Sequence, residues 1–487
     1  MRVVILGAGI SGHTAALLLR RKLSRKHEVI VISPNSLWNW IPSNIWVGVG
    51  KMMPADVTFN LRAVYNRARI KFHQAKATEI YPEGSSDLPR PHVLIESTSD
   101  SNPDAKLGTK IKIEYDYLIN ATGPRLNFGA TPGLGPDGFT HSVCTVDHAR
   151  DTALELDQLI LEMKAGAQKT LVVGTGHGLC TCEGAAFEYI FNLEFELQQK
   201  GVRDKARLIF LTNEAELGDF GVGGLQLKNG GFVTPSKVFA ESMFVERDVN
   251  WITGAHVHRV EKNKLEYETL DGEHSFLDFD FAMLLPPFTG VPLKAFNKTG
   301  EDISTQLFNP AGFMKVDADY TAKTYEQWSP EDWPQTYQTT YPNIFAIGIA
   351  FAPPHQISKP RKSKNGTPIA PAPPRTGMPS AIMGRVVANS IVDMINGVSS
   401  HPTNAASMTE IGAACVASAG ANAFAGSAVS MTMYPIVPNF KTYPKTGRSL
   451  VHTTGELGIA GHWIKKLLHY AFIYKAKALP FWWIIPE

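Results

Sequence analysis

The sequence predicts an α/β protein: two Rossmann-like domains, the first in two segments with the second inserted between them, and a C-terminal segment that associates with a membrane. A short apolar strand, a glycine-rich loop and a helical pattern follow one another at residues 3–19 and again at 171–199. Two more apolar strands, ending near residues 120 and 347, run into small residues. Repeated strand–loop–helix units of this kind build parallel sheets that are covered by helices.

The predicted first domain comprises residues 1–150 and 295–395, the second residues 151–294, and the C-terminal region residues 396–487. A chain of 487 residues is long enough for about three domains. The net charge is +2 and charged residues make up 19%, so we expect neither a nucleic-acid partner nor extensive disorder. Four cysteines cannot form a disulfide framework in a chain of this length, and they indicate free thiols.

Neither a signal peptide nor a membrane-spanning helix is expected. The stretch from Arg2 to Leu6 already has the character of a first strand, so no leader is predicted before it. No run of about 18 residues is apolar enough to span a bilayer.

The first glycine-rich loop, "GAGISG", has the spacing of a dinucleotide-binding turn. Gly7 permits the tight turn, Gly9 lets the backbone approach a pyrophosphate, and Gly12 lets helix and strand pack closely. The helix N-terminus that follows favours negative charge. We therefore predict that this loop, with Ile10 and Ser11, binds a dinucleotide.

The second predicted strand, within "EVIVISPN", ends without the acidic residue that usually binds the adenosine ribose. Ser33 or Asn35 could supply a neutral hydrogen-bonding substitute. The contact with the adenosine is therefore less firmly predicted than the contact with the pyrophosphate.

Two widely separated segments complete the same site. "YDYLINATGPRLNF" predicts a strand that ends in Ala121, Thr122 and Gly123, and "YPNIFAIGIAFAPP" predicts one that ends at Gly348. Glycine at that point would let the backbone approach a flavin. Strands that return to one nucleotide site in this way are typical of flavoproteins with two dinucleotide-binding folds, so we predict bound FAD and include Ala77 among its contacts.

The second glycine-rich loop, within "GTGHGLCTCEGAAFEY", belongs to a strand–loop–helix unit like that of a nicotinamide-binding domain, but its residues are poorly suited to binding that cofactor. Leu171–Val173 is the expected strand, the helix is expected from about Glu183 to Gln199, and "ARLIFLTNE" is the next strand. A nicotinamide site would have glycine in place of Leu179, whose side chain would hinder close helix–strand packing. The loop carries two cysteines, and no second close pair or histidine array follows them, so no metal site is predicted.

Several motifs along the chain resemble those of the sulfide:quinone oxidoreductases, and more distantly those of sulfide-dehydrogenase flavoproteins and type II NADH dehydrogenases. In order, they are "GAGISG", "WIPSNIWVGVG", "HSVCTVDHA", "CEGAAFEY", "LGDFGVGG", "MLLPPFTGVP", "IFAIGIAFAPP" and "PPRTGMPSAIMG", and the resemblance covers about residues 1–395. It implies an enzyme in which FAD accepts electrons from sulfide and passes them to a membrane quinone.

The resemblance also implies roles for individual cysteines. Cys182 corresponds to the redox cysteine of the second-domain loop, and its position just before a helix favours the thiolate. Cys144 corresponds to a cysteine near the flavin that is bonded to it in some relatives. His148 is a candidate acid or base because imidazole titrates near neutrality, and loop packing is an equally good interpretation. Cys415 is a further catalytic candidate or a small buried side chain.

Pro42, Ser43 and Asn44, from the most distinctive of these motifs, are expected to line the approach of the quinone to the flavin. Two departures from the family pattern are visible. Most relatives have a second redox cysteine where this chain has Ala350, so either Cys182 works with one of the other three cysteines or sulfide reacts differently. Many relatives have lysine near the flavin where this chain has arginine, so the charge is retained but the donor geometry differs.

Beyond Arg375, the arginine that stands where many relatives have this lysine, the C-terminal sequence changes character twice. Residues 398–431 are rich in alanine, serine and glycine, which suits a pair of packed segments or a loop over the active site. In "GELGIAGHWIKKLLHYAFIYKAKALPFWWIIPE" apolar residues follow helical spacing among lysines and aromatic residues.

We interpret this last segment as a helix at a membrane surface, with Lys465, Lys466, Lys475 and Lys477 directed toward anionic headgroups. The alternative is a helix docked on the protein's own core. A quinone enzyme needs access to lipid, which favours the membrane interpretation.

The predicted function is that of a membrane-associated sulfide:quinone oxidoreductase that uses FAD, with sulfide, a membrane quinone and the bilayer surface as partners. One alternative is an NADH:quinone oxidoreductase of the same fold, against which Leu179 argues. The others are a sulfur-sensing flavoprotein without turnover, suggested by Ala350, and a soluble sulfide dehydrogenase that delivers electrons to a cytochrome. Homo-oligomerisation, the side of the membrane and covalent attachment of FAD stay open.

Overall fold

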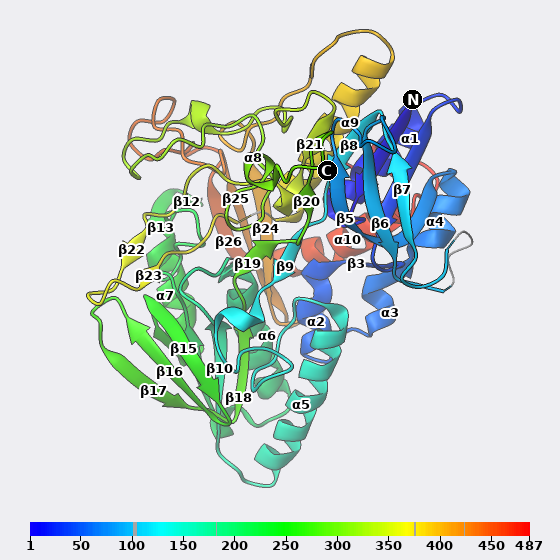
Figure 1. Ribbon diagram of the computed structural model, residues 1–487. Helices are drawn as coiled ribbons and strands as arrows, with labels where there is room; N and C mark the ends of the chain where they lie inside the picture. The colour runs from blue at the N-terminus through cyan, green and yellow to red at the C-terminus, as the bar shows by residue number, and fades with distance from the viewer. Residues whose placement is uncertain (101–104, 182, 375, 423) are drawn as a thin grey trace.

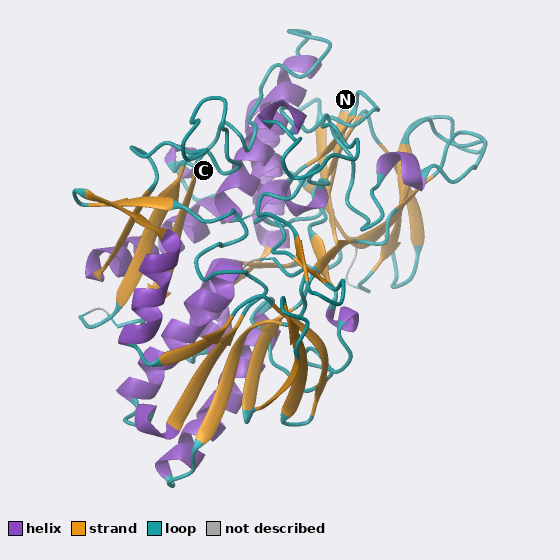
Figure 2. Ribbon diagram, turned by 90° about the vertical axis from the view of Figure 1, so that its left-hand side faces the viewer, coloured by secondary structure: helices purple, strands orange, loops and turns teal. Residues whose placement is uncertain are grey.

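The computed structural model of the chain describes residues 1–100, 105–181, 183–374, 376–422 and 424–487. Its N-terminal part contains a mixed sheet with a parallel core, its middle part contains a four-stranded parallel sheet, and a five-stranded sheet is formed mainly by strands near the C-terminus (Figure 1). Figure 2 shows helices running between these groups of strands. The predicted α/β class with two Rossmann-like sheets is confirmed.

The first sheet is built around the N-terminal strands. In the order β21–β8–β1–β2–β5–β6–β7, its strands are Ile344–Ala346, Tyr117–Asn120, Arg2–Leu6, Glu28–Ser33, Lys71–Tyr81, His92–Ser97 and Lys110–Glu114. The first five run parallel, and β6 and β7 continue antiparallel. β1 and β2 are buried almost throughout, as expected for apolar strands covered on both faces. Helices α1 (Ile10–Lys22) and α9 (Gly377–Ile395) pack against each other beside this sheet.

The second sheet has the order β14–β11–β10–β18, and all its strands run parallel. These strands are Val249–Ile252, Ala206–Leu211, Lys169–Thr175 and Phe281–Leu285, and the helices of this region are α5 (Val146–Lys164), α6 (Glu183–Gln199) and α7 (Ser236–Glu246). α6 begins and ends where the sequence predicts, and β10 extends beyond the predicted strand at both ends. A separate antiparallel sheet follows, formed by β15 (Ala255–Glu261), β16 (Lys264–Thr269) and β17 (His274–Asp278).

The third sheet combines a hairpin from the middle of the chain with C-terminal strands. In the order β13–β12–β26–β25–β24, its strands are Phe232–Pro235, Gln226–Asn229, Thr454–Gly458, Ser427–Met433 and Ala413–Ala419. The segment rich in alanine, serine and glycine therefore forms the predicted pair of packed segments, as the antiparallel strands β24 and β25. Their small side chains allow β24 to lie against α6 and α10 (Ile459–Ala476).

Shorter elements connect these layers. They are β3 (Leu37–Asn39), α2 (Asn44–Gly48), α3 (Pro54–Val57), β4 (Thr58–Asn60), α4 (Leu61–Ala68), β9 (Pro124–Leu126), β19 (Phe288–Gly290), β20 (Lys294–Ala295), α8 (Ser304–Leu307), β22 (Arg361–Lys362) and β23 (Pro368–Ile369). Across the described part of the chain, no helix combines the length and the apolar character that crossing a membrane requires.

Candidate active site

The carboxyl ends of β1, β8 and β21 meet at one edge of the first sheet, where the backbone is packed too tightly for side chains. A Cβ atom on Gly7 would lie 2.2 Å from the carbonyl oxygen of Ala121, and one on Gly12 would lie 2.2 Å from the carbonyl oxygen of Gly7. Gly348 has a φ of +64°, and a Cβ there would lie 2.5 Å from Oγ of Ser11. The separated segments that the sequence assigns to one nucleotide site are therefore neighbours.

Gly9 and the first turn of α1 leave room for a negatively charged group. A Cβ on Gly9 would meet no described atom within 4 Å, and no described side chain caps the helix there. The N–H groups at a helix start attract phosphate. Ile10 reaches toward Gly377 of α9, and Ser11 is buried against Gly348, so both residues support the loop. This edge of the sheet fits the pyrophosphate of a dinucleotide.

The other residues predicted to bind the dinucleotide lie farther along the same edge. Ser33 is the buried last residue of β2, whereas Asn35 is exposed. Ala77 lies on β5 beyond the end of its parallel contact with β2. Oγ1 of Thr122 donates to Oδ1 of Asn120 at 2.8 Å, so this side chain is held by its own strand.

Helix α2 brings three of the sequence motifs together. Asn44 is fully buried, and its Nδ2 donates to the carbonyl oxygen of Val143 at 3.2 Å and to Oδ1 of Asn39 at 3.0 Å. The hydroxyl of Tyr189 on α6 donates to the carbonyl oxygen of Gly48 at 3.1 Å. The segment that contains Asn44 therefore lies between the segment that contains Cys144 and helix α6.

The same helix is also linked to the C-terminal helix. Oγ of Ser43 lies 2.8 Å from Nδ1 of His469 on α10, and both residues are buried. Pro42 beside them is only half-buried. The side chains of Ser43 and Asn44 thus hold α2 in place, and α10 closes over this part of the protein.

Cys144 and Cys180 lie close enough to influence each other. The backbone N–H of Cys144 donates to Oγ of Ser142 at 3.1 Å, and burial raises the pKa of the Cys144 thiol to about 11. Sγ of the fully buried Cys180 donates to the carbonyl oxygen of Leu285 at 3.0 Å. Burial raises the pKa of Cys180, and ionisation of Glu183 or Cys144 would raise it further. Both thiols are therefore protonated at neutral pH.

Three other predicted residues are Cys182, Arg375 and Cys415. Cys182 and Arg375 lie outside the described residues. Cys415 lies on β24, where burial and the negative charge of Glu188 raise its pKa to about 11. Its surroundings are therefore the polar contacts between α6 and α10.

His148 lies in the first turn of α5, where its ring makes an edge-on contact with Phe128 at a centroid distance of 5.9 Å. No described group bonds its buried Nδ1, and burial lowers the pKa of the ring. The ring lines a surface hollow together with Asp151 and Asn263. None of these described contacts joins His148 to Cys144, although the two residues are four apart in the sequence.

Three carboxyl groups that the sequence analysis did not single out lie near the second glycine-rich loop: Glu183 and Glu214 are buried, and Asp219 is half-buried. No described donor bonds either carboxyl oxygen of Glu183, and burial together with the charges of Glu214 and Asp219 raises its pKa well above the usual range. Burial and the charge of Asp219 raise the pKa of Glu214 to about 8. These groups can hold and release protons near the cysteines.

The second glycine-rich loop is covered by residues 368–373. The N–H of Ala370 donates to the carbonyl oxygen of Gly178 at 2.8 Å, and the N–H of Ala372 donates to that of Cys180 at 2.9 Å. A Cβ on Gly178 would lie 2.4 Å from the carbonyl oxygen of Pro368. Residues 368–373 therefore pack directly against this loop, and a Cβ on Gly176, the counterpart of Gly9, would lie 2.4 Å from the Leu134 side chain.

Leu179 does not act as the sequence analysis expects. Its side chain is 40% exposed, and α6 begins only at Glu183. The prediction that Leu179 hinders helix–strand packing is wrong, because this side chain lies in the loop ahead of the helix. The covering segment 368–373 closes the loop instead.

Helix α10 turns cations inward and apolar side chains outward. Its buried polar residues are His462, Lys465, His469 and Lys475, and its exposed apolar residues include Trp463, Ile464, Leu467 and Tyr470. Lys465 pairs with Glu188, and Lys475 pairs with Glu487 at 2.8 Å. The prediction that Lys465 and Lys475 face headgroups is wrong, because buried carboxylates hold both.

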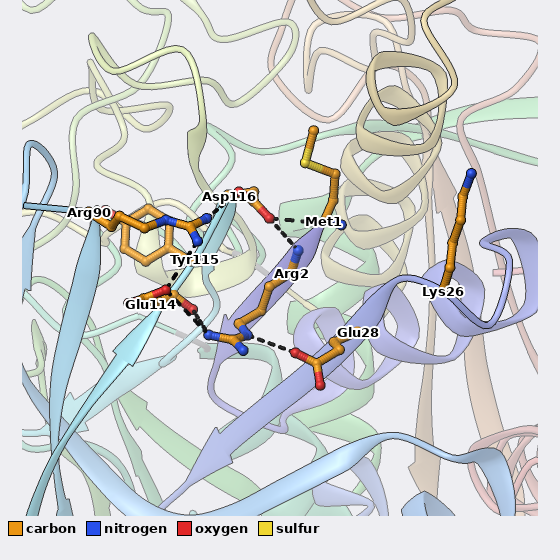
Figure 3. A pocket seen from close by; sticks show the side chains of 8 residues that line it. All are labelled: Met1, Arg2, Lys26, Glu28, Arg90, Glu114, Tyr115 and Asp116. Carbon is orange, nitrogen blue, oxygen red and sulfur yellow. Dashed lines mark hydrogen bonds and ion pairs between the residues drawn. The ribbon is translucent and has the colours of Figure 1, made fainter.

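A separate hollow lies at the opposite, amino-terminal edge of the first sheet (Figure 3). Arg2 pairs there with Glu28 at 2.8 Å, and Arg90 pairs with Asp116 at 3.0 Å. Open parallel sheets bind their ligands at the carboxyl edge. The charges of this hollow already neutralise one another, so it is a surface network of ion pairs.

Comparison with known proteins identifies relatives. Residues 1–194 match the family of pyridine nucleotide-disulphide oxidoreductases. The chain is 30% identical over 421 residues to the sulfide-quinone reductase of Aquifex aeolicus (strain VF5), a match that covers 86% of this chain and 82% of that protein. It is 23% identical over 291 residues to a mitochondrial sulfide:quinone oxidoreductase of Dictyostelium discoideum, covering 59% of this chain and 56% of that protein.

Solved structures share the fold. The sulfide:quinone oxidoreductase of Aquifex aeolicus superposes with a TM-score of 0.73 at 27% identity, over 98% of this chain and 91% of that chain. NDH2 from Plasmodium falciparum, in complex with NADH, superposes with a TM-score of 0.63 at 15% identity, over 98% of this chain and 96% of that chain. This second likeness concerns the fold alone.

Proposed function

Because the chain belongs to the sulfide:quinone oxidoreductase family, we propose that it oxidises sulfide at cysteine sulfur and passes the electrons through FAD to a membrane quinone. One observation carries the proposal. Residues 368–373 hydrogen-bond across the second glycine-rich loop, and this loop holds Cys180 and leads into Cys182. A loop that is closed to a nicotinamide cofactor and carries thiols suits electron entry from a sulfur compound.

The carboxyl edge of the first sheet would hold FAD. The turn at Gly7, the open approach at Gly9 and the helix start behind it would bind the pyrophosphate, and Ser33 would face the ribose. The turn at Gly348 would support the flavin from the second segment of the domain. When bound, FAD supplies a two-electron acceptor.

Cys182 and Cys144 would carry the sulfur. Ala350 is 3% exposed and offers no thiol, so the partner of Cys182 comes from elsewhere. The segment that contains Cys144 and helix α6, which follows Cys182 in the chain, both contact the segment of Asn44. Sulfide oxidation releases protons, and Glu214, with a pKa raised to about 8 by burial, can exchange them near neutral pH.

Helix α10 would rest on the membrane. Trp463 is 55% and Leu467 68% exposed on its outer face, while Lys465 and Lys475 are paired inside. An exposed apolar stripe with aromatic residues suits the boundary between headgroups and acyl chains. The polar inner face bonds to Ser43 of the segment that leads into α2, which brings the lipid surface close to the proposed site. The side of the membrane stays open.

Anaerobic flavin bleaching tests the electron path. We expect sulfide to bleach the flavin of the purified protein and NADH to leave it oxidised. Cys182→Ser and Cys144→Ser should retain flavin but lose most of the sulfide response. Cys415→Ser is the matched control, because Cys415 lies among the contacts of α6 and α10, and it should respond like the unaltered protein. Bleaching by NADH, or full bleaching by sulfide in Cys182→Ser, would refute the proposed path.

Co-sedimentation with lipid vesicles tests the membrane contact. Replacing both Trp463 and Leu467 by serine should move the protein to the supernatant without releasing flavin. The control replaces Leu154 and Leu161 on α5, which are 63% and 61% exposed, by serine. Equal sedimentation of the two double variants would contradict the role of α10.

A further inference from the structure

A cluster of histidines and carboxylates lies on the antiparallel sheet β15–β17, away from the proposed flavin edge. Its central members are His258 on β15, Glu268 on β16 and His274 on β17. Each offers one ligand atom, and these atoms all lie within 4.8 Å of one another. The proposed electron path uses none of them.

An irregularity in β15 gathers these side chains on one face. Glu268 pairs in register with His256 on one side and with His274 on the other. The register then shifts between Val257 and Arg259, which leaves His258 as an extra residue in the ladder. A bulge of this kind re-aims a side chain. His258 consequently reaches Glu268, with its Nε2 lying 2.9 Å from Oε2.

The carboxylate of Glu268 is only 1% exposed, and hydrogen bonds from a neighbouring loop fix its position. Oγ1 of Thr367 donates to its Oε2 at 2.7 Å, and Nδ2 of Asn365 donates to its Oε1 at 3.1 Å. These donors come from the loop between β22 and β23, which lies beside this sheet in Figure 1. Metal-binding carboxylates are typically oriented by such outer hydrogen bonds.

His274 is oriented in the same manner. Its Nδ1 lies 3.2 Å from Oε1 of Glu266, and an ionised carboxylate can only accept, so Nδ1 donates. The neutral ring then keeps its lone pair on Nε2, which lies 3.9 Å from Oε2 of Glu268. Ligand atoms around a tetrahedral zinc ion are separated by about 3.3 Å, given metal–ligand bonds of about 2.0–2.1 Å. The ligand atoms lie within 4.8 Å of one another, so the side chains must close by up to about 1.5 Å to reach this value. Nε2 of His258 donates to Glu268, and binding of the ion there would release this proton.

We propose that His258, Glu268 and His274 form a binding site for a divalent transition-metal ion of the zinc class. A set of two imidazoles and one carboxylate favours zinc over magnesium and calcium, which prefer ligand sets made of oxygen atoms alone. The side chain of His274 is 45% exposed, which provides an entry path and leaves a fourth position for water. The three ligands come from three adjacent strands, so a bound ion would cross-link the sheet.

The site is connected to the second glycine-rich loop. The ring of His258 lies 4.7 Å from that of His256, and Nδ1 of His256 accepts the N–H of Gly178 at 2.9 Å. The ring of His177, from the same loop, lies 4.5 Å from that of His256. Immobilising His258 on a metal ion would therefore also restrict the loop.

Equilibrium dialysis of untagged, full-length, flavin-loaded protein tests the site. The chain is first treated with a chelator and then equilibrated with Zn²⁺ or Mg²⁺, and the bound metal is measured by elemental analysis. We expect one Zn²⁺ per chain, no comparable Mg²⁺ binding, and a higher thermal midpoint with Zn²⁺. His274→Gln should weaken Zn²⁺ binding by about tenfold or more, and its partly exposed position makes it compatible with folding.

Two further variants keep the test specific. His258→Gln should weaken binding as His274→Gln does, whereas His401→Gln alters an exposed histidine outside the cluster and should bind like the unaltered protein. Bound Co²⁺ should give the visible absorption of a four-coordinate ion, at longer wavelength than the flavin bands. Zn²⁺ binding that is unchanged in both cluster variants, or that is absent from the unaltered protein, overturns the proposal.

Discussion

Lys465→Met should loosen the C-terminal helix from the protein. The side chains of Lys465 and Glu188 are only 8% and 10% exposed, and they form an ion pair between α10 and α6. Nζ of Lys465 also donates to the carbonyl oxygen of Val416 at 2.9 Å, and Oε1 of Glu188 accepts from Oγ of Ser418 at 2.6 Å. Methionine keeps much of the length of the side chain but removes the charge.

The expected magnitude follows from the burial of the carboxylate that is left behind. After the substitution, Glu188 retains the donors of Ser418 and has no counter-charge among the described residues. Removing one partner of a buried ion pair typically destabilises by about 3–5 kcal/mol. Because a factor of ten corresponds to about 1.4 kcal/mol, local opening of α10 should become at least roughly 100-fold more frequent.

Amide hydrogen exchange measures this opening directly, because the slow amides of α10 report its local free energy. Lys466→Met is the matched control, since Lys466 is half-buried and the structure shows no ion pair for it among the described residues. The double variant Lys465→Met/Glu188→Gln removes both charges and should recover about 1–3 kcal/mol relative to the single variant. Exchange that accelerates less than about fivefold in Lys465→Met, or no recovery in the double variant, would refute the argument.

Three further outcomes are expected. Burial raises the pKa of Glu214 from 4.5 to about 8, so between these pH values the folded protein holds a proton that the unfolded chain has lost. The free energy of unfolding should therefore fall as the pH rises from about 4.5 to about 8. Glu214→Gln should flatten this slope in thermal midpoints measured across the range. Gly348→Ala should reduce the flavin retained on gel filtration, because its Cβ would meet Oγ of Ser11 at 2.5 Å. The control Gly397→Ala, at a φ of +74° with no neighbour within 4 Å, should retain flavin. Equal retention in the two variants would contradict the steric argument. Leu179→Gly should not make the flavin reducible by NADH in anaerobic spectra, because the covering segment remains, and reduction by NADH would show that Leu179 alone blocks the loop.

The nucleotide edge could be predicted because its signals are local. The turn at Gly7, the helix start after Gly9 and the close packing at Gly12 depend on neighbouring residues within one strand–loop–helix unit. The helix that begins at Glu183 was predicted for the same reason. The error at Leu179 arose because glycine spacing does not reveal which way a loop side chain turns, and Leu179 is 40% exposed.

The C-terminal helix shows the limit of sequence periodicity. Helical spacing indicates which residues share a face, but it does not indicate which face turns inward. Lys465 is drawn inward by Glu188, a buried carboxylate on a helix far away in the sequence. A sequence pattern would assign a lysine to solvent by default, because an unpaired buried lysine is rare. The apolar residues expected at the membrane are exposed, whereas Lys465 and Lys475, expected beside them, are buried.

The buried carboxyl groups and the histidine cluster were missed for a related reason. Glu183 and Glu214 are ordinary polar residues until the fold removes water around them. His258 lies on β15 and His274 on β17, with β16 between them, and a bulge in β15 brings both side chains to one face. A paired histidine pattern, His256-x-His258, was the one signal that could have prompted a search for this site.

By itself, the sequence determined the two strand–glycine–helix units, the family motifs and the absence of a thiol at Ala350, because each depends on residue type and short-range spacing. Only the tertiary structure decided that residues 368–373 cover the second loop, that the segment of Cys144 and helix α6 meet at α2, and which face of α10 turns outward. These features depend on desolvation and on contacts between distant segments, and both exist only after the chain has folded.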